Sequence, residues 1–517
     1  MKKTWLGLLM PVLFCACSEQ NVGGEFFLRG QEVKIASANE NLWPVFMSGD
    51  AMFANAEDGG CYFGKIIKNE WQKAEGLPKN DGQDDWEIVH FAQGYNGELI
   101  LLNQPMFGMV INSLVKIPNA DNAVAILDQK KWERYDLKQL QGVRDVARSG
   151  AAISDTTILT AISYTDGIKR LFSILDFKNQ KAIPLDYWPE DESPNDTARW
   201  YNHVAGCTIL GNGKGKFLYQ NRFAKLAYIF SVDGTKVNKL CDMYSYRFTQ
   251  KRPTECLSCC ANSERIHMLL RDSNIKGEKF KEDSDMFGNI IEVFNWDGVK
   301  QQVIHLDNYY QQIMLSGDGN TLFLLPGMTD EIIKPAIYSY DISNLEDNPM
   351  IDSIEIEKIC KANIEKTIKK YGKKDFLKEG DMMVDFEMYD YNDKPHHLNE
   401  FLGKDKYTIL VFNDLYCGWC QKAKPYLEKF YKQNKGKFEM ITVSTDKLSE
   451  WKKKPFGEVS WHDWNDHNCA IDIRNKYDAQ GTPTFFVLTP EGKIVKKHAG
   501  FSEQIFDEMK DIVSGKK

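Results

Sequence analysis

Residues 416–420 read Tyr416-Cys417-Gly418-Trp419-Cys420, and the pattern of the chain changes across them. Before them, the apolar, β-branched run at 407–412 predicts a buried strand. After them, Ala423, Leu427 and Phe430 recur at helical spacing among Lys and Glu residues, which predicts a helix. Two cysteines three positions apart at a strand-to-helix junction lie on one turn, close enough to form a disulfide bond. The stretch therefore predicts a thiol–disulfide exchange site.

The first cysteine of the pair is expected to be the more reactive one. Its sulfur points toward the unpaired N–H groups of the helix start, whose field stabilises a thiolate and lowers the thiol pKa. Zinc binding is the alternative for any Cys-x-x-Cys pair. Structural zinc takes four ligands, usually as two such pairs, and no second pair follows Cys420 at zinc-finger spacing. Redox chemistry is therefore favoured, and no metal or other cofactor is expected.

A second motif comes some sixty residues later, where Gly481-Thr482-Pro483-Thr484 precedes the apolar run at 485–488. Proline lacks an N–H and is disfavoured inside a sheet, so at a strand start it indicates a special peptide bond, such as a cis bond. The lead-in segment 386–401, Pro425 inside the helix and the turn at 491–493 accompany these motifs in order. From about Met382 to the end, the chain resembles the thioredoxin fold, in particular its periplasmic TlpA-like reductase branch.

This resemblance implies a role for each residue of the site. Cys417 is expected to attack a substrate disulfide, and Cys420 to resolve the mixed disulfide that forms. Trp419, Thr482 and Pro483 are expected to contact the substrate, Thr482 through backbone hydrogen bonds and Pro483 from beneath the sulfur pair. If the protein is a reductase, a membrane electron donor of the DsbD type must reduce it again.

The sequence departs from the family pattern at several positions. Val411 stands where many thioredoxins carry a buried Asp that accepts the proton of the second cysteine. Asp414 is either a substitute for that acid or a loop residue. Asp414 also stands where a peroxidase variant of the fold would have Thr, which disfavours a peroxidase. Trp419 replaces a common Pro between the cysteines, so the reduction potential cannot be inferred from the family.

The first residues resemble a bacterial lipoprotein leader. Lys2 and Lys3 precede a short apolar core, and Ala16 stands directly before Cys17. Residues 1–16 are expected to be a signal peptide, Cys17 the lipid-modified residue and 17–23 a tether, with cleavage of an ordinary secreted protein nearby as the alternative. The mature protein would then be lipid-anchored in the cell envelope and face the periplasm. Ser18 is not an inner-membrane retention Asp, which favours the outer membrane.

Length and charge limit the remaining possibilities. A chain of 517 residues predicts two or three domains. A net charge of −8 with both signs mixed gives no argument for nucleic-acid binding. Twelve cysteines are many for a cytosolic protein and few for a disulfide-stapled protein of this size.

Residues 24–352 are expected to be all-β and repetitive. Asp-Gly and other polar turns follow six apolar strands, which recur roughly every 45 to 65 residues, the length of one propeller blade. The strands lie at 61–67, 123–127, 171–176, 227–232, 290–294 and 337–341. This region resembles TolB-like β-propellers, which implies a six-bladed ring without exposed sheet edges. A β-sandwich or two smaller domains remain the alternative.

Three further segments carry possible sites. Residues 353–380 are charged and helically patterned, which predicts a connecting helix and linker. Cys256, Cys259 and Cys260 form a second Cys-x-x-Cys pattern, interpreted as buried or disulfide-paired strand cysteines rather than a metal or redox site. The run at 462–469 is rich in His and Asp and is interpreted as a loop before a helix rather than a metal site.

The sequence thus predicts a multidomain protein, with a six-bladed β-propeller at 24–352 and an α/β thioredoxin-like domain at 381–517. The predicted function is a lipid-anchored, periplasm-facing thiol–disulfide oxidoreductase that acts on protein disulfides, with a propeller that binds a partner or substrate. The alternative is a scaffold lipoprotein, in which the propeller does the binding and the cysteine pair is a redox switch or inactive.

Overall fold

The computed structural model describes residues 23–35, 42–49, 51–56, 61–76, 88–94, 98–104, 111, 113–117, 126–137, 140–166, 170–189, 203–204, 206–221, 226–245, 256–271, 288–326, 336–371, 376–403, 405–415, 417–444, 446, 448–453, 459–466, 471–479 and 481–515. The chain forms two compact units, residues 1–372 and 373–517. The leader predicted at 1–16, the lipidation site predicted at Cys17 and Tyr416 of the cysteine motif lie outside the described residues.

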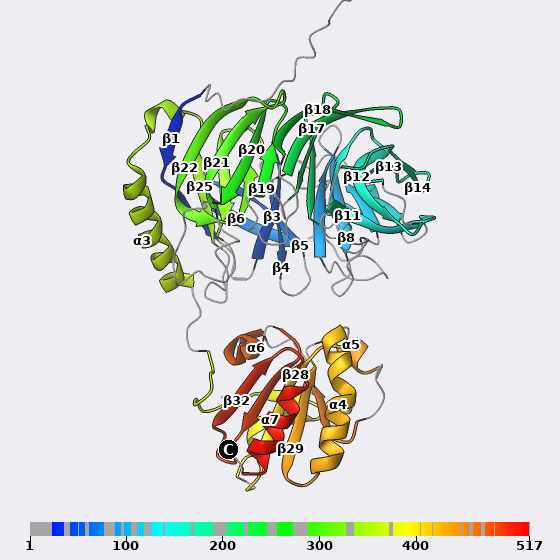
Figure 1. Ribbon diagram of the computed structural model, residues 1–517, viewed down its shortest axis with the longest axis vertical. Coiled ribbons are helices and arrows are strands. Elements are labelled where there is room, and N and C mark those ends of the chain that lie inside the picture. Colours follow the sequence, from blue (N-terminus) through cyan, green and yellow to red (C-terminus); the bar gives the residue numbers. More distant parts are fainter. Residues whose placement is uncertain are drawn as a thin grey trace, which may run out of the picture. The chain divides into compact units, whose positions relative to one another are not determined.

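The first unit is built from antiparallel strands that follow one another along the chain (Figure 1). Its strands are β1 (Glu25–Leu28), β2 (Gln31–Ile35), β3 (Leu42–Ser48), β4 (Ala51–Ala56), β5 (Cys61–Ile67), β6 (Glu70–Gly76), β7 (Ile88–Gln93), β8 (Leu99–Gln104), β9 (Ser113–Ile117), β10 (Glu133–Asp136), β11 (Val143–Ala152), β12 (Thr157–Tyr164), β13 (Phe172–Asp176), β14 (Lys181–Pro184), β15 (Cys207–Gly211), β16 (Lys216–Asn221), β17 (Leu226–Asp233), β18 (Lys236–Ser245), β19 (Cys256–Ala261), β20 (Arg265–Arg271), β21 (Gly288–Asn295), β22 (Lys300–Tyr310), β23 (Gln312–Leu315), β24 (Thr321–Leu325) and β25 (Ile337–Asp341).

The described strands pair as six four-stranded antiparallel meanders. They are β3–β6, β7–β10, β11–β14, β15–β18, β19–β22, and β23–β25 completed by β2. β1 adds to the fifth meander in parallel with β22. The first strand of each meander contacts the first strand of the next, and β23 contacts β3. The six meanders therefore close on themselves in sequence order.

Strand β2 joins the two ends of this series. It pairs with β25 of the last meander, where Val33 lies opposite Ile337. Its end pairs with β6 of the first meander, where Ile35 lies opposite Trp71. Val33 is 2% exposed in a core shared by strands of both meanders. The N-terminal strand thus links residues about 300 positions apart and joins the last meander to the first.

Most of the expected strands are confirmed, and the turn residues explain their ends. Gly234 and Gly298 adopt φ values of 57° and 78° in the turns after β17 and β21, a region that glycine enters without steric cost. The strand expected at 123–127 is wrong in its described part. Ile126 and Leu127 form a helical turn, and Ile126 packs into the core beside Trp132, whose indole N–H donates to the Ile126 carbonyl.

Helix α3 (Ser353–Tyr371) lies along β22 at the edge of the first unit (Figure 1). Ile356, Cys360 and Ile364 are four residues apart and bury one face of the helix against Phe27 and Tyr309. The remaining face is charged and exposed. The helix expected in this connecting segment is therefore present, and it packs on the β-structure.

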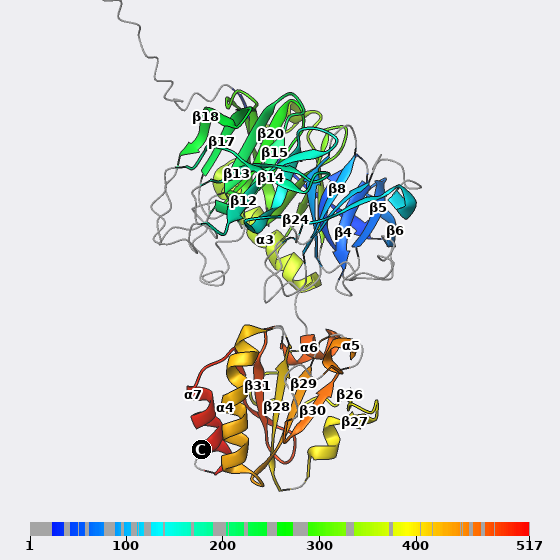
Figure 2. The same cartoon turned by 90° about the vertical axis from the view of Figure 1, so that its right-hand side faces the viewer.

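The second unit is a seven-stranded sheet with helices on both faces (Figure 2). Its order is β27-β26-β30-β29-β28-β31-β32, with β28, β29 and β30 parallel. The elements are β26 (Glu387–Tyr389), β27 (Pro395–His397), β28 (Tyr407–Asn413), α4 (Gly418–Asn434), β29 (Phe438–Ser444), α5 (Leu448–Trp451), β30 (His462–Asn465), α6 (Ile471–Tyr477), β31 (Thr484–Leu488), β32 (Ile494–Ala499) and α7 (Gln504–Val513).

Alternating side chains of the central strands fill two cores. From β28, Ile409 and Val411 pack under α4 and α7, whereas Leu410 and Phe412 pack on the opposite face with Tyr477 of α6. Both sets are at most 1% exposed. Because both faces are covered, β28 is apolar throughout, as its sequence predicts. The described residues His462–Asn465 form strand β30, so the loop expected from 462 is wrong for this part.

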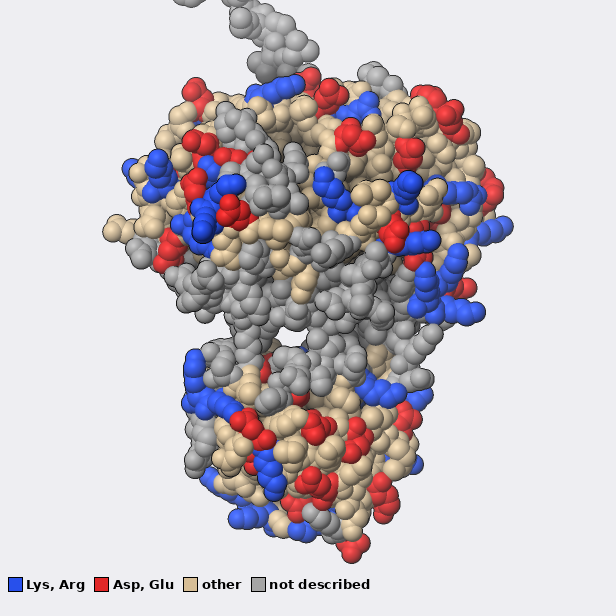
Figure 3. Space-filling view, turned by 180° about the vertical axis from the view of Figure 1, so that it is seen from behind, with Lys and Arg blue, Asp and Glu red and all other residues tan. Residues whose placement is uncertain are grey.

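None of the described helices is long and apolar enough to cross a bilayer. On the face shown in Figure 3, Lys and Arg side chains are interspersed with Asp and Glu side chains on each unit.

Candidate active site

Cys417 is the N-cap residue of α4, at the point where the chain leaves the buried strand β28. Its backbone is extended, with φ −73° and ψ 113°, and its sulfur accepts a hydrogen bond of 3.4 Å from the backbone N–H of Cys420. A helix start leaves four backbone N–H groups without partners inside the helix. The Cys417 sulfur takes the capping position that a Ser or Asp oxygen usually occupies.

The two thiols of the pair have opposite electrostatic environments. Partial burial alone would raise the pKa of Cys417, but hydrogen bonds from Thr482, from Cys420 and from the N–H of Trp419 outweigh it and hold the pKa below its usual value. Burial raises the pKa of Cys420 to about 12, and the neighbouring Cys417 adds to the rise. Both thiols are unbonded in the structure. At neutral pH, Cys417 is the better nucleophile of the two.

The loop before β31 closes over the sulfur of Cys417. The peptide bond between Thr482 and Pro483 is cis. The Thr482 carbonyl accepts a hydrogen bond of 3.2 Å from the Cys417 thiol, and its hydroxyl donates one of 2.6 Å to the Asp414 carboxylate. Pro483 lines a cavity together with Cys420. The structure thus brings together Cys417, Cys420, Thr482 and Pro483.

Trp419 lies at the same end of α4, but its ring faces solvent. It is 56% exposed, and the Lys422 ammonium lies 4.3 Å from the centre of its ring. An exposed indole beside a nucleophile offers apolar contact area to an incoming polypeptide.

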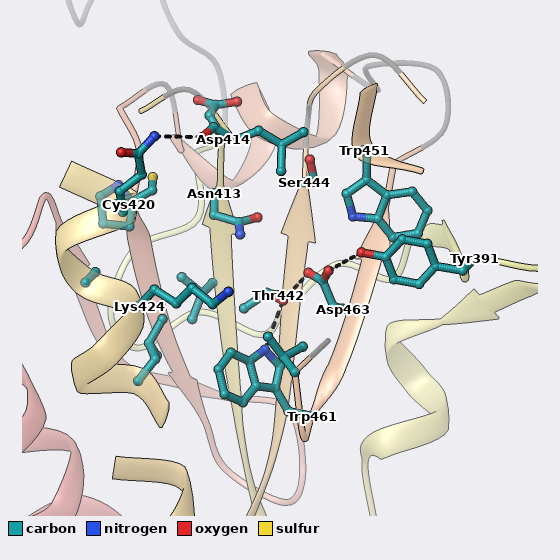
Figure 4. Close-up of a pocket in the computed structure, with 17 residues that line it drawn as sticks. Tyr391, Asn413, Asp414, Cys420, Lys424, Thr442, Ser444, Trp451, Trp461 and Asp463 are labelled. Carbon is teal, nitrogen blue, oxygen red and sulfur yellow. Dashed lines mark hydrogen bonds between the residues drawn. The ribbon is translucent and has the colours of Figure 1, made fainter. Parts of the chain in front are cut away.

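A small cavity of about 60 Å³, partly open to solvent, lies behind Cys420 between α4 and the sheet (Figure 4). Asp463 sits on its far wall, where its carboxylate accepts hydrogen bonds of 2.6 Å from Thr442 and 2.8 Å from Tyr391. The Tyr391 ring stacks on Trp451 with 3.9 Å between ring centres. Burial raises the pKa of Asp463. This aromatic wall was not predicted from the sequence.

Asp446 is a second buried residue that the sequence reasoning missed. It is 5% exposed and lies just beyond the carboxyl end of β29, which pairs in parallel with β28. Residues that directly follow neighbouring parallel strands lie together at one edge of the sheet. This rule could have predicted Asp446 as a residue of the site.

The other cysteine cluster lies on a strand of the first unit. Cys256, Cys259 and Cys260 are on β19, and none of them forms a disulfide. Burial raises the pKa of Cys259 to about 12 and that of Cys260 well above its usual value. Among the described residues, no three His, Cys, Asp or Glu side chains are placed to hold a metal ion.

The second unit is a thioredoxin-like domain, because a parallel-centred sheet with helices on both faces carries a Cys-x-x-Cys pair at a helix start. Residues 404–494 match the family described as Thioredoxin-like. This confirms the fold predicted for the C-terminal part of the chain.

Relatives of this domain include thiol–disulfide oxidoreductases. ResA from Bacillus subtilis is 29% identical over 132 residues, which is 25% of this chain and 70% of ResA. Nucleoredoxin from Xenopus laevis is 27% identical over 96 residues, 18% of this chain and only 23% of the nucleoredoxin. A crystal structure of the thioredoxin domain of a thiol–disulfide oxidoreductase from Bacteroides vulgatus is 28% identical, covers 26% of this chain and 99% of that chain, and has a TM-score of 0.23.

Proposed function

We propose that this protein is a lipid-anchored, periplasm-facing oxidoreductase that reduces protein disulfides through Cys417 and Cys420. The observation that carries the proposal is the pair of contacts on the Cys417 sulfur. A backbone N–H of the helix start stabilises its thiolate, and the carbonyl of Thr482 lies 3.2 Å away. The thiol–disulfide oxidoreductases among the relatives support the same chemistry.

The reaction proceeds in two exchanges. The Cys417 thiolate attacks one sulfur of a substrate disulfide, so that a mixed disulfide forms and the other substrate sulfur leaves as a thiolate. Cys420 then loses its proton and attacks the Cys417 sulfur. A disulfide forms between the two cysteines, and the substrate leaves with both sulfurs reduced. Two electrons have passed to the substrate, and a membrane electron donor of the DsbD type returns them to the protein.

Three groups contact the substrate in this proposal. The main chain of Thr482 offers hydrogen bonds to an extended peptide, and Pro483 lies under the reacting sulfurs. Trp419 presents its exposed indole at the same edge.

The first unit is a six-bladed, TolB-like β-propeller in this proposal. The six four-stranded meanders and the contacts between their first strands support that architecture, because a propeller places the first strand of each blade around a central axis. Its role is to bind a partner or to arrange access to the redox site. Cys17 carries the lipid anchor, and Ser18 directly after it favours the outer membrane.

Replacing Cys420 by Ala tests the function directly, because the first exchange can occur but the second cannot. The variant is expected to accumulate mixed disulfides on Cys417 in cells, seen as higher-mass species that disappear on reduction. The matched control is the double variant Cys417→Ala, Cys420→Ala, which lacks the nucleophile as well. Equal patterns in the two strains would contradict an exchange function and favour the scaffold alternative.

A further inference from the structure

The exposed face of α4 beside the redox pair carries a cation on an aromatic ring. Trp419 and Lys422 are three residues apart, so they lie on the same face of the helix. The Lys422 ammonium is 4.3 Å from the centre of the Trp419 ring. An ammonium at this distance is attracted to the ring, which restrains an otherwise flexible side chain. The positive charge is therefore held at a defined place on the surface.

The charge is close to the reacting sulfur because Trp419 stands between the two cysteines. The Trp419 backbone N–H donates a hydrogen bond to the Cys417 sulfur, and its ring is 56% exposed. In a mixed disulfide, the substrate cysteine is bonded to Cys417, and neighbouring substrate residues are about 3.8 Å apart from Cα to Cα. A side chain one or two residues from that cysteine can therefore reach the Trp419 ring and the Lys422 ammonium.

The Lys422 ammonium makes no ion pair with a carboxylate of the described residues. Two carboxylates on neighbouring segments are held by other groups. Asp414 is 9% exposed and accepts a hydrogen bond of 2.6 Å from the Thr482 hydroxyl. Glu503 accepts one of 2.6 Å from the hydroxyl of Tyr426, which follows Lys422 by about one turn of α4. The charge of Lys422 is thus available to a ligand.

Two other lysines of α4 have different surroundings. Lys424 lines the cavity behind Cys420, and Figure 4 shows its side chain extending across that cavity. Lys432 lies in the last turn, ten residues after Lys422, which corresponds to about 15 Å along the helix axis. That separation exceeds the Debye length of about 8 Å at physiological ionic strength. Lys432 is therefore a matched control for the charge of Lys422.

We propose that Lys422 selects substrates that carry a carboxylate within two residues of the cysteine under attack, an inference that rests on the proposed function. The Trp419 ring holds the ammonium in place and offers apolar contact to the same substrate segment. A substrate carboxylate gains an ion pair there, whereas a substrate lysine meets a like charge. Because both groups are exposed, the interaction acts mainly on the rate of encounter and is weakened by salt. Lys422 takes no part in the bonds that form and break.

The test measures the first exchange with three synthetic peptides, each with one cysteine carried as a 2-pyridyl disulfide. The residues on both sides of that cysteine are Glu, Gln or Lys. Attack by Cys417 on the peptide sulfur forms the mixed disulfide and releases pyridine-2-thione, which is followed by its absorbance. The reduced full-length protein is used, and the release seen with Cys417→Ala is subtracted as the background from other thiols.

The measured quantity is the ratio of the second-order rate constants for the Glu and Gln peptides. Each rate constant is first divided by that for mercaptoethanol with the same peptide, which corrects for the intrinsic reactivity of the disulfide. Any effect of a variant on the pKa of Cys417 cancels in the ratio, because it changes both rate constants equally. The ratio therefore reports on substrate preference alone.

The wild type is expected to react about fourfold faster with the Glu peptide than with the Gln peptide at low ionic strength, and the ratio should approach one in about 1 M salt. Lys422→Gln should lower the ratio to about one. Lys422→Glu should reverse the preference, so that the Lys peptide reacts fastest. Lys432→Gln makes the same change of charge at the far end of the helix and should keep the wild-type ratio.

Three results would overturn the proposal: equal rates for the three peptides in the wild type, a wild-type ratio that persists in Lys422→Gln, or an equal fall of the ratio in Lys432→Gln. Each of them can be observed, because Lys422 and Lys432 are exposed and their replacement should leave the fold intact. Absence of Cys417-dependent release with every peptide would instead refute the proposed function.

Discussion

Cys417→Ser is expected to reduce the rate of protein-disulfide reduction by at least about 1,000-fold, to the level of the buffer control. A serine hydroxyl in the same capping position keeps the hydrogen bond from the helix start but is not ionised near neutral pH, so it cannot attack a disulfide. Insulin reduction by the full-length protein, with dithiothreitol as electron donor, measures the effect.

Cys260→Ser is the matched control for that experiment. It removes a half-buried thiol of the first unit, whose pKa burial raises well above the usual value. Its rate should equal that of the wild type. Residual activity in Cys417→Ser above a few per cent would show that another thiol carries the reaction and would contradict the assignment.

Val33→Asp is expected to destabilise the first unit by at least about 3 kcal/mol. Val33 is 2% exposed and packs with Trp71 of the first meander and Ile337 of the last. A carboxylate at this buried position would lose its hydration without gaining a hydrogen-bond donor. Strand β2 would then have to separate from β6 and β25. Chemical denaturation followed by tryptophan fluorescence, together with limited proteolysis, measures the loss.

Gln31→Asp is the control, because it adds the same charge to an exposed position of the same strand. Its effect should stay within about 0.5 kcal/mol. Alkylation of Cys417 in the same samples reports on the second unit and should not change in either variant. If Val33→Asp unfolds at the same denaturant concentration as the wild type, β2 does not close the array.

The strand, turn and helix that hold Cys417 and Cys420 could be predicted, because the sequence patterns that determine them are local. The apolar strand, the cysteine spacing and the helical pattern lie within about 25 residues, and the structure places Cys417 at the start of α4 as those signals indicate. The approach of Thr482 from 65 positions away was inferred only through family resemblance, because no local pattern links the two segments. Trp419 could be placed on the helix, but its exposure depends on which face the domain leaves open.

The features that sequence reasoning missed are non-local. Asp446 meets Asp414 only because β28 and β29 pair in parallel at one register, and a shift of one residue would separate them. Ile126 illustrates a different failure. A short apolar run is compatible with a strand or a buried turn, and packing against Trp132 decided between them. The closing role of β2 required contacts across about 300 residues, which no pattern in the chain displays.

The most direct test of the account is the pKa of the Cys417 thiol in the reduced full-length protein. The rate of its alkylation by iodoacetamide, followed by mass spectrometry of the labelled peptide, rises with the thiolate fraction. Because the pKa is lowered, the thiolate should persist as the pH falls, and the inflection should lie below the ordinary thiol value of about 8.5. An inflection at or above about 8.5 would contradict activation by the helix start and, with it, the proposed chemistry.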